Sequence, residues 1–262
     1  MAERQVALVT GASTGIGAEF ARALAARGND LVIVARNVAR LRELADGLEA
    51  DHDVQVEVLP ADLETDDGIK KVEARFADGA RPVDLLVNNA GFGTSGPFFE
   101  VPVEGEVAEI TLNVVALVRL THAALGPMVA RGRGGVINVS SVGAYQPTPN
   151  MATYSATKAF VSSFTNAIHE ELTGTGVKAM VLAPGYTHTE FHVRANVKKD
   201  GAMPGFIWQS PDKVVGAALK AYEKGRAVCI PGAINAAAAA FSGSMPAAVS
   251  RKIAGMVTKR SS

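Results

Sequence analysis

The sequence contains a single cysteine, Cys229, so the chain cannot form an internal disulfide bond. Lysine plus arginine and aspartate plus glutamate balance at 26 residues each, which leaves no basic surplus for neutralising nucleic-acid phosphates. Nothing before the first predicted strand, at Gln5, has the pattern of a signal peptide. We therefore expect a cytoplasmic protein that has no nucleic-acid partner.

Charged residues are absent from Ala227 to Ser250, a stretch long enough to raise the question of a membrane span. Prolines, glycines and serines interrupt it, among them Pro231 and Pro246, so we expect no transmembrane helix. At 262 residues with 48% hydrophobic content, the chain is suited to one domain with a buried core. We expect a single domain over residues 1–262.

Short apolar, β-branched runs alternate with longer helical patterns along the chain, which is typical of βαβ units and a parallel sheet covered on both faces. The sequence predicts an α/β, doubly wound Rossmann fold with seven strands. The expected strands are Gln5 to Thr10, Leu31 to Ala35, Val54 to Leu59, Val83 to Val87, Gly135 to Ser140, Lys178 to Ala183 and Ala227 to Ile230.

A glycine-rich turn, Thr10-Gly-Ala-Ser-Thr-Gly-Ile-Gly17, follows the first strand and opens a helix. Glycines at 11, 15 and 17 permit a tight turn and a close approach of the backbone to a pyrophosphate. The positive N-terminus of the helix adds electrostatic attraction for the phosphates. A glycine turn of this kind can be purely structural, but its place after the first strand indicates a dinucleotide site.

A tyrosine and a lysine stand four residues apart in Tyr154-Ser-Ala-Thr-Lys158, so on a helix they share one face. A free phenol titrates near 10, and a fixed positive charge nearby lowers that pKa toward the working range of an acid-base catalyst. Ser141 lies thirteen residues before the tyrosine. The pattern predicts a proton-transfer site, against the alternative of a partly exposed pair on an ordinary helix.

Together these motifs resemble the short-chain dehydrogenase/reductase (SDR) family from about Gln5 to Gly232. The other matching pieces, in order, are Asp62, Asn88-Asn-Ala-Gly91, Asn113 and Pro184-Gly185 followed by Thr189. The resemblance implies an oxidoreductase that transfers hydride between a nicotinamide cofactor and a carbonyl or secondary alcohol. It implies these catalytic roles: Ser141 binds the substrate oxygen, Tyr154 exchanges the proton, Lys158 holds the nicotinamide ribose and Asn113 positions a relay water.

The end of the second strand bears on the cofactor. An acid there would accept the ribose hydroxyl of NAD, whereas Arg36 is able to bind the 2′-phosphate of NADP. We expect NADP(H) to be preferred over NAD(H), the alternative being that Arg36 is a solvated loop charge. The resemblance implies cofactor contacts by Gly11, Ser13, Thr14, Gly15, Ile16, Gly17, Arg36, Asp62, Leu63, Asn89, Ala90, Gly91, Tyr154, Lys158, Pro184, Gly185, Thr187 and Thr189.

Several of these residues have a structural alternative. Asn113 is either the residue that positions the relay water or a buried asparagine that satisfies backbone groups. Asp62 is either an adenine contact or the N-cap of the next helix. The segment from Asn88 to Gly91 either lines the cofactor cleft or is a simple turn. Ser140 is expected to be structural, because strand alternation points it away from its neighbour Ser141. His188 and His192 have the spacing of paired zinc ligands on a helix, but no third ligand is evident and we expect no metal site.

Residues 186–210 resemble the family's variable substrate lid. The candidate substrate walls suggest a hydrophobic substrate, unless they are core residues: Phe92, Tyr145, Met151, Tyr186, Phe191, Phe206 and Trp208. The tail, residues 233–262, has a helical apolar pattern at Val249, Ile253, Met256 and Val257. It is expected to cap the pocket, pack on a sister subunit or contact a membrane surface peripherally. The resemblance also implies a homodimer or homotetramer.

Two other functions are compatible with this fold. One is a non-catalytic dinucleotide sensor or scaffold, which would not need all four catalytic residues. The other is an epimerase or dehydratase relative that uses transient hydride transfer, although such relatives often carry Gly-x-x-Gly-x-x-Gly, which this chain lacks.

Overall fold

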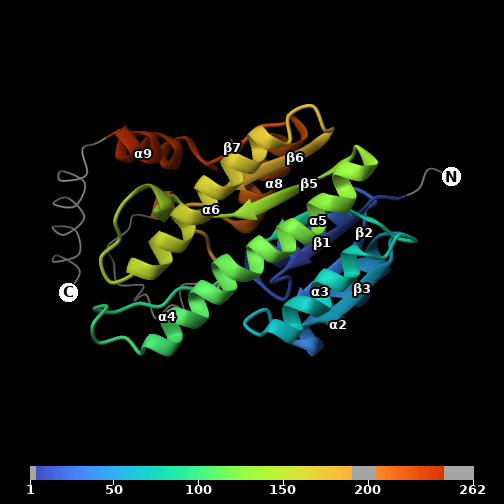
Figure 1. Cartoon of the computed structure of the whole chain (residues 1–262), viewed down its shortest axis with the longest axis horizontal. Helices are drawn as coiled ribbons and strands as arrows, with labels where there is room; N and C mark the ends of the chain where they lie inside the picture. The colour runs from blue at the N-terminus through green and yellow to red at the C-terminus, as the bar shows by residue number, and fades with distance from the viewer. Residues whose placement is uncertain (1–3, 191–204, 245–262) are drawn as a thin grey trace.

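A computed structural model describes residues 4–190 and 205–244, which form a parallel sheet with helices on both faces (Figure 1). The sheet has seven strands in the order β3-β2-β1-β4-β5-β6-β7. The strands are β1 (Val6–Thr10), β2 (Asp30–Ala35), β3 (Val56–Pro60), β4 (Val83–Asn88), β5 (Gly134–Val139), β6 (Val177–Leu182) and β7 (Val228–Cys229). The predicted doubly wound fold and its seven strands are confirmed.

The strand ends differ from the predicted ones by at most two residues. The largest relative difference is at β7, which has two residues where Ala227 to Ile230 was predicted. This strand lies at the edge of the sheet, so its hydrogen bonds within the sheet go to β6 alone. They include a bond from the amide of Ala183 to the carbonyl of Cys229 at 2.9 Å.

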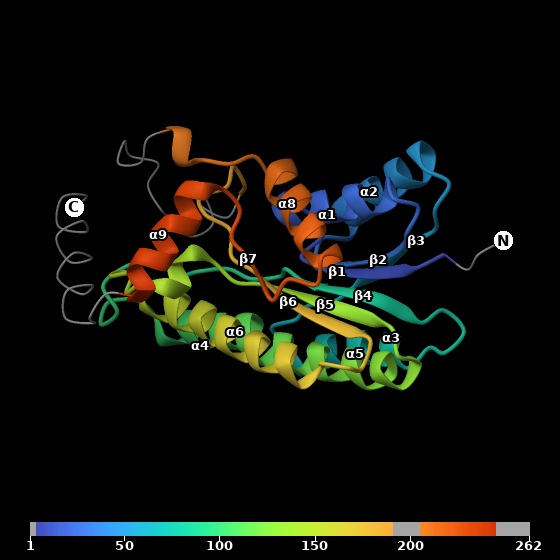
Figure 2. The same ribbon diagram turned by 90° about the horizontal axis from the view of Figure 1, so that it is seen from above.

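Helices cover both faces of the sheet, as Figure 2 shows from above. One face carries α1 (Gly15–Ala25), α2 (Val38–Asp51) and α8 (Pro211–Glu223). The other carries α3 (Asp66–Phe76), α4 (Val103–Ile110), α5 (Leu117–Arg131) and α6 (Ala152–Glu171). Shorter elements are the π-helix η1 (Thr111–Ala116), the 3-10 helices η2 (Val142–Tyr145) and η3 (Gly205–Ile207), and the terminal helix α9 (Ala233–Ser244).

Alternation along the strands divides the core into two layers. In β1, Ala7 and Val9 pack under α1 and α8, whereas Val6 and Leu8 pack toward α3 and α5. All four side chains are buried, which explains why the strand is apolar at every position rather than at every second one. The sheet is thus a rigid platform whose loops carry the polar residues.

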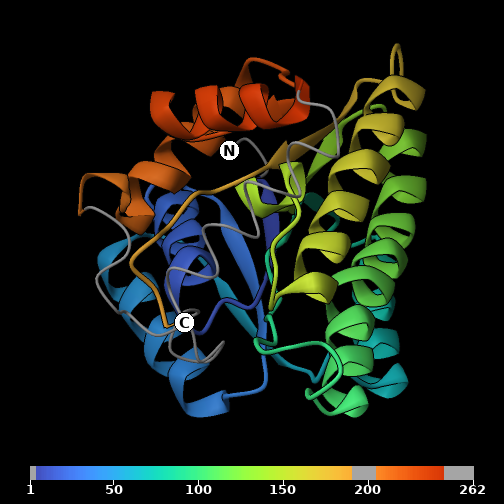
Figure 3. The same ribbon diagram turned by 90° about the vertical axis from the view of Figure 1, so that its left-hand side faces the viewer.

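Strand β1 pairs with both β2 and β4, so the chain order reverses direction at β1. In sheets of this type, ligands bind at such a switch point, beyond the carboxyl ends of the strands. Figure 3 looks toward this end of the sheet, where α9 lies across one side and the loops after β1, β4 and β5 converge. The predicted motif residues all follow the carboxyl ends of strands or lie on helices beside them.

Helices α4 and α5 join through η1 into one helix of 29 residues, Val103–Arg131. An 18-residue window of this helix has a mean hydropathy of 1.4, so by length and composition the helix could cross a membrane. Its α5 part packs along β4 and β5, however, and buries Leu117, Leu120 and Met128 against the sheet, so we assign α5 to the core. The predicted tail helix beyond residue 244 lies outside the described residues.

Candidate active site

The glycine turn after β1 requires its glycines. Gly11 has a φ of 65°, in the left-handed region, and a Cβ there would lie 2.9 Å from the Cα of Ala90. At Gly17, a Cβ would lie 2.3 Å from the carbonyl oxygen of Gly11. The N-cap residue of α1, Thr14, makes no side-chain cap, and no acidic residue stands in the first turn. The N-terminal amides of α1 are therefore suited to an anionic ligand, so the residues fit the phosphates of a dinucleotide.

The segment after β4 fastens this turn. The side-chain amide of Asn89 donates to the carbonyl oxygen of Thr10 at 2.9 Å, and the hydroxyl of Thr10 accepts from the backbone amides of Asn89 and Ala90 at 3.0 Å. Asn88 points the other way and is buried, where it donates to Asn138 at 2.9 Å and Thr121 at 3.0 Å. The motif thus braces the sheet with Asn88 and holds the glycine turn with Asn89.

Arg36, at the end of β2, is exposed and forms an ion pair with Glu64 at 2.8 Å. Asp62 lies 4.0 Å from the same guanidinium nitrogen. The N-cap of α3 is Thr65, whose hydroxyl accepts from the amide of Gly68, so the N-cap alternative for Asp62 is wrong. The side chain of Leu63 is buried in the core.

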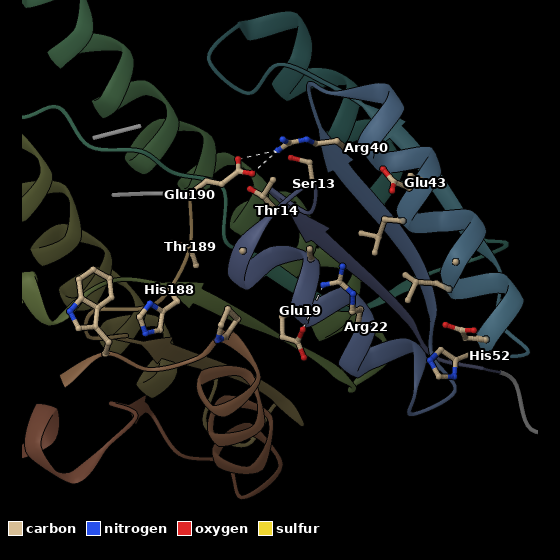
Figure 4. A pocket seen from close by; sticks show the side chains of 18 residues that line it. Ser13, Thr14, Glu19, Arg22, Arg40, Glu43, His52, His188, Thr189 and Glu190 are labelled. Atoms are coloured by element: carbon tan, nitrogen blue, oxygen red, sulfur yellow. Dashed lines mark hydrogen bonds and ion pairs between the residues drawn. The ribbon is translucent and has the colours of Figure 1, made fainter. Parts of the chain in front are cut away.

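A cleft of about 900 Å³ opens beside the glycine turn, between α1 and α2 (Figure 4). Ser13, Thr14 and Gly15 line one end of it. Above them, Arg40 forms an ion pair of 3.0 Å with Glu190. Neither residue was predicted from the sequence: a second arginine four positions after Arg36 was a usable signal for Arg40, but nothing local connects it with Glu190.

Ser140 and Ser141, which follow β5, have different environments. The hydroxyl of Ser140 is buried and donates to the backbone carbonyl of Lys158 at 2.7 Å. Ser141 is the N-cap of η2, where its hydroxyl accepts from the amide of Gly143 at 3.1 Å, and it also hydrogen-bonds with Tyr154. The expectation that Ser140 is structural agrees with these contacts, and Ser141 is the serine that faces the tyrosine.

Tyr154 and Lys158 both lie on α6, with the ammonium of Lys158 5.8 Å from the centre of the tyrosine ring. Burial raises the pKa of Tyr154 to about 12, and the hydrogen bond with Ser141 only partly opposes this. Burial likewise lowers the pKa of Lys158 to about 8, while its ammonium donates to the carbonyl of Val139 at 2.9 Å. The expected lowering of the tyrosine pKa is therefore not seen in the protein alone, because desolvation outweighs the hydrogen bond with Ser141.

Asn113 lies in the π-helix η1, an irregularity often found at functional sites. Its side-chain amide donates to the carbonyl of Phe92 at 2.9 Å, and its oxygen accepts from the amide of Phe92 at 3.2 Å. A Cβ at Gly91 would lie 2.8 Å from that oxygen and 3.3 Å from the ammonium of Lys158. Asn113 therefore fixes the loop that links the glycine turn to the tyrosine and lysine.

The chain after β6 crosses the glycine turn. A Cβ at Gly15 would touch the Thr189 side chain at 3.0 Å, and the hydroxyl of Thr187 donates to the carbonyl of Gly185 at 3.0 Å. The carbonyl of Pro184 accepts from the amide of Val142, at the start of η2. Of the predicted residues from Pro184 to Thr189, Thr189 thus lies against the glycine turn and Pro184 lies beside η2.

The predicted substrate walls are partly described. The rings of Tyr186 and Trp208 have centroids 5.4 Å apart, and Trp208 stacks on His188 at 5.0 Å. Residues 191–204 of the predicted lid, which include Phe191 and His192, lie outside the described residues. No group of three or more metal-ligating side chains lies within residues 4–190 and 205–244, which leaves the paired-histidine hypothesis untested.

Comparison with known proteins assigns the chain to a family. The family model described as "short chain dehydrogenase" matches residues 5–200. A very-long-chain 3-oxoacyl-CoA reductase of Bos taurus is 32% identical over 82% of this chain and 67% of its own length. Three curated relatives are matched over 60 to 67% of their lengths, so the chain spans about two thirds of these proteins.

Two solved structures are similar over most of both chains. A short-chain dehydrogenase from Sphingobium yanoikuyae in complex with NADPH has a TM-score of 0.82 and 36% identity, over 92% of this chain and 96% of that one. An alcohol dehydrogenase of Comamonas testosteroni, described as specific for bulky-bulky ketones, has a TM-score of 0.77 and 33% identity, over 87% and 86%. The glycine turn, the tyrosine and lysine of α6 and these similarities lead to one conclusion: the chain belongs to the short-chain dehydrogenase/reductase family, whose members use a nicotinamide cofactor, and is an oxidoreductase acting on a carbonyl or alcohol.

Proposed function

We propose that this enzyme is an NADP(H)-preferring reductase or dehydrogenase of hydrophobic ketones and secondary alcohols, with Tyr154 as the acid-base catalyst. The observation that carries the proposal is the short link between the two ends of the site. A Cβ at Gly11 would touch Ala90, and a Cβ at Gly93 would lie 2.9 Å from the Tyr154 ring, so the loop from Ala90 to Gly93 spans from the dinucleotide turn to the tyrosine.

The chain's own residues divide the work of the reaction. The bound cofactor supplies or accepts the hydride at the nicotinamide ring. The Ser141 hydroxyl binds the substrate oxygen, and Tyr154 donates a proton to that oxygen in reduction or removes it in oxidation. Lys158 is held by the Val139 carbonyl with its ammonium close to Gly91, where the family resemblance expects the nicotinamide ribose.

The proposed cofactor preference rests on cationic side chains and the absence of an acid at the end of β2. Arg36 follows Ala35 directly, and Arg40, in the first turn of α2, lines the cleft beside the glycine turn. Glu64 and Glu190 now neutralise these two arginines, so a 2′-phosphate would compete with the carboxylates for them. A neighbour solved with NADPH supports the preference.

The proposed substrate class rests on the apolar and aromatic walls near the tyrosine. A Cβ at Gly93 would lie 3.2 Å from the terminal methyl of Met151, so this side chain borders the same space as the Tyr154 ring. Burial raises the pKa of Tyr186, which indicates low polarity around it. Such walls favour ketones with two large apolar substituents.

The test is turnover with a panel of ketones and secondary alcohols graded in size, followed by nicotinamide absorbance with NADPH or NADH. We expect faster turnover of bulky apolar ketones than of small polar ones, and faster turnover with NADPH. Absence of turnover across the panel with either cofactor, in a folded protein, would argue for the dinucleotide-sensor alternative. We also propose that the enzyme is cytoplasmic, works without a metal and assembles as a homodimer or homotetramer.

A further inference from the structure

Glu109 is a fully buried carboxylate that the proposed proton transfer does not use. Its Oε2 atom accepts hydrogen bonds from the backbone amide and the hydroxyl of Thr94, both at 2.8 Å. Its Oε1 atom is buried and has no hydrogen-bond partner within residues 4–190 and 205–244. A buried carboxylate that is only half satisfied is costly, so its presence calls for a compensating interaction.

The position of Glu109 places it beside the catalytic residues. It stands four residues before Asn113, so the two side chains lie on the same side of the helix that begins at Val103. Both hold the loop after β4, Asn113 at Phe92 and Glu109 at Thr94. That loop also approaches the ammonium of Lys158, which a Cβ at Gly91 would meet at 3.3 Å.

Charged and titratable groups act on Glu109 from its own helix and from α6. Glu106, one turn earlier, accepts from the hydroxyls of Thr94 and Thr153, and its charge raises the pKa of Glu109. Burial raises that pKa more, whereas Lys158 lowers it. In return, Glu109 raises the pKa of both Lys158 and Tyr154.

The charge of Glu109 thus raises the pKa of both catalytic groups, Lys158 and Tyr154. Burial removes water from the Lys158 ammonium and favours its neutral form, and a negative charge within the protein opposes that loss. The same negative charge disfavours the phenolate of Tyr154. Both effects keep protons on the pair.

We propose that Glu109 is a positioning residue, the buried counter-charge of Lys158, and that it sets the pH range over which Lys158 and Tyr154 remain protonated. It acts through these two residues and touches neither substrate nor cofactor. The inference rests on the proposed catalytic function of Tyr154 and Lys158. A purely structural role, in which Glu109 only fastens the Thr94 loop, would not move the titration of the pair.

The first test compares pH profiles of kcat/KM for wild type, Glu109→Gln and Glu104→Gln. Glutamine is close in size to glutamate and removes one charge, and Glu104 is exposed on the same helix, so the second variant removes the same formal charge at a distance from Lys158. In Glu109→Gln, we expect the pH profile of ketone reduction to fall at its basic side about one pH unit lower than in wild type. The pH profile of alcohol oxidation should rise at its acidic side about one pH unit lower than in wild type. Glu104→Gln should match wild type.

Profiles of folded Glu109→Gln and wild type that superimpose, or equal shifts in the two variants, would overturn the proposal. A direct titration covers the case in which Glu109→Gln does not fold, and it needs no turnover. The Glu109 carboxyl is followed by 13C NMR in full-length wild type and Lys158→Met labelled at glutamate. Because coupling between two groups is reciprocal, the pKa of Glu109 should rise when the lysine charge is removed.

An unchanged Glu109 pKa in Lys158→Met would show that the two groups are not coupled, which refutes the inference. The two proposals fail in distinguishable ways. If the panel of ketones and alcohols gives no turnover but the NMR shift is present, the catalytic assignment is wrong and the counter-charge stands.

Discussion

The hydroxyl of Ser140 donates a 2.7 Å hydrogen bond to the backbone carbonyl oxygen of Lys158. The lysine's ammonium in turn donates to the carbonyl of Val139, the residue before Ser140. The end of β5 and the first half of α6 are therefore joined by two reciprocal contacts, one through each side chain. This arrangement fixes where the lysine ammonium can lie relative to Ser141 and Tyr154.

The two adjacent serines should respond differently to alanine. Ser141→Ala should lower turnover strongly, because the lost hydroxyl faces the tyrosine, and should lower the free energy of unfolding by about 0.5–2 kcal/mol, because the same hydroxyl caps η2. Ser140→Ala should keep most of the turnover of the folded enzyme but lower the free energy of unfolding by about 0.5–1.5 kcal/mol, since it removes the buried hydrogen bonds of this hydroxyl with the Lys158 carbonyl and the Ser162 hydroxyl. Steady-state kinetics and urea denaturation of both variants separate the effects, and the reverse pattern would contradict the assignment.

Tyr154→Phe should reduce kcat by about 10²- to 10⁴-fold, the usual contribution of a general acid-base group. Binding of NADPH, measured by fluorescence titration, should stay within a few-fold of wild type. Lys158→Met should lower kcat and also weaken cofactor binding, because its ammonium is proposed to contact the ribose. Turnover of Tyr154→Phe near the wild-type rate would remove the tyrosine from the mechanism.

Arg36→Ala should weaken NADPH binding by about tenfold and leave NADH binding nearly unchanged, because only NADPH carries the 2′-phosphate. This is the lower end of the range for a charge-assisted contact, since Arg36 is 60% exposed and paired with Glu64. Glu64→Gln should strengthen NADPH binding by freeing the guanidinium. Arg42→Ala, which removes a charge from the exposed face of α2, is the control. Equal losses for both cofactors would mean that Arg36 is a solvated loop charge.

The buried Lys158 should make stability depend on pH. Its pKa is lowered from 10.5 to about 8 in the folded state, so between these values the unfolded chain binds more protons. The free energy of unfolding should therefore rise from pH 8 toward pH 10, with this residue contributing up to about 1.4 kcal/mol per pH unit. Urea denaturation at pH 8, 9 and 10 should show a smaller rise for Lys158→Met; parallel curves would contradict the lowered pKa.

Two glycine-to-alanine substitutions should have opposite outcomes. Gly17→Ala should abolish dinucleotide binding and destabilise the fold, because its Cβ would lie 2.3 Å from the Gly11 carbonyl oxygen. Gly47→Ala, in α2, meets no atom within 4 Å and should raise the free energy of unfolding by about 0.5–1 kcal/mol. Thermal or urea denaturation measures the change in stability of both variants, and a cofactor titration measures dinucleotide binding.

Much of this molecule could be predicted from the order of its residues, because the relevant signals are local. Apolar strands, the glycine turn and the spacing of Tyr154 and Lys158 each depend on residues within one element or one turn. They were sufficient for the parallel sheet and the family. The strand ends were less certain, as β7 shows, because an edge strand stops where its neighbour offers no further pairing.

Only the tertiary structure decided which partner each charged side chain has and how far that side chain is removed from water. Arg36 pairs with Glu64 and Arg40 with Glu190, which stand 28 and 150 residues away along the chain. Glu109 reads in the sequence as one more acid on an amphipathic helix, yet folding buries it within reach of Lys158's field. The pKa of Tyr154 was predicted to fall and instead rises, because desolvation by the surrounding fold depends on contacts distant in sequence that no local pattern encodes.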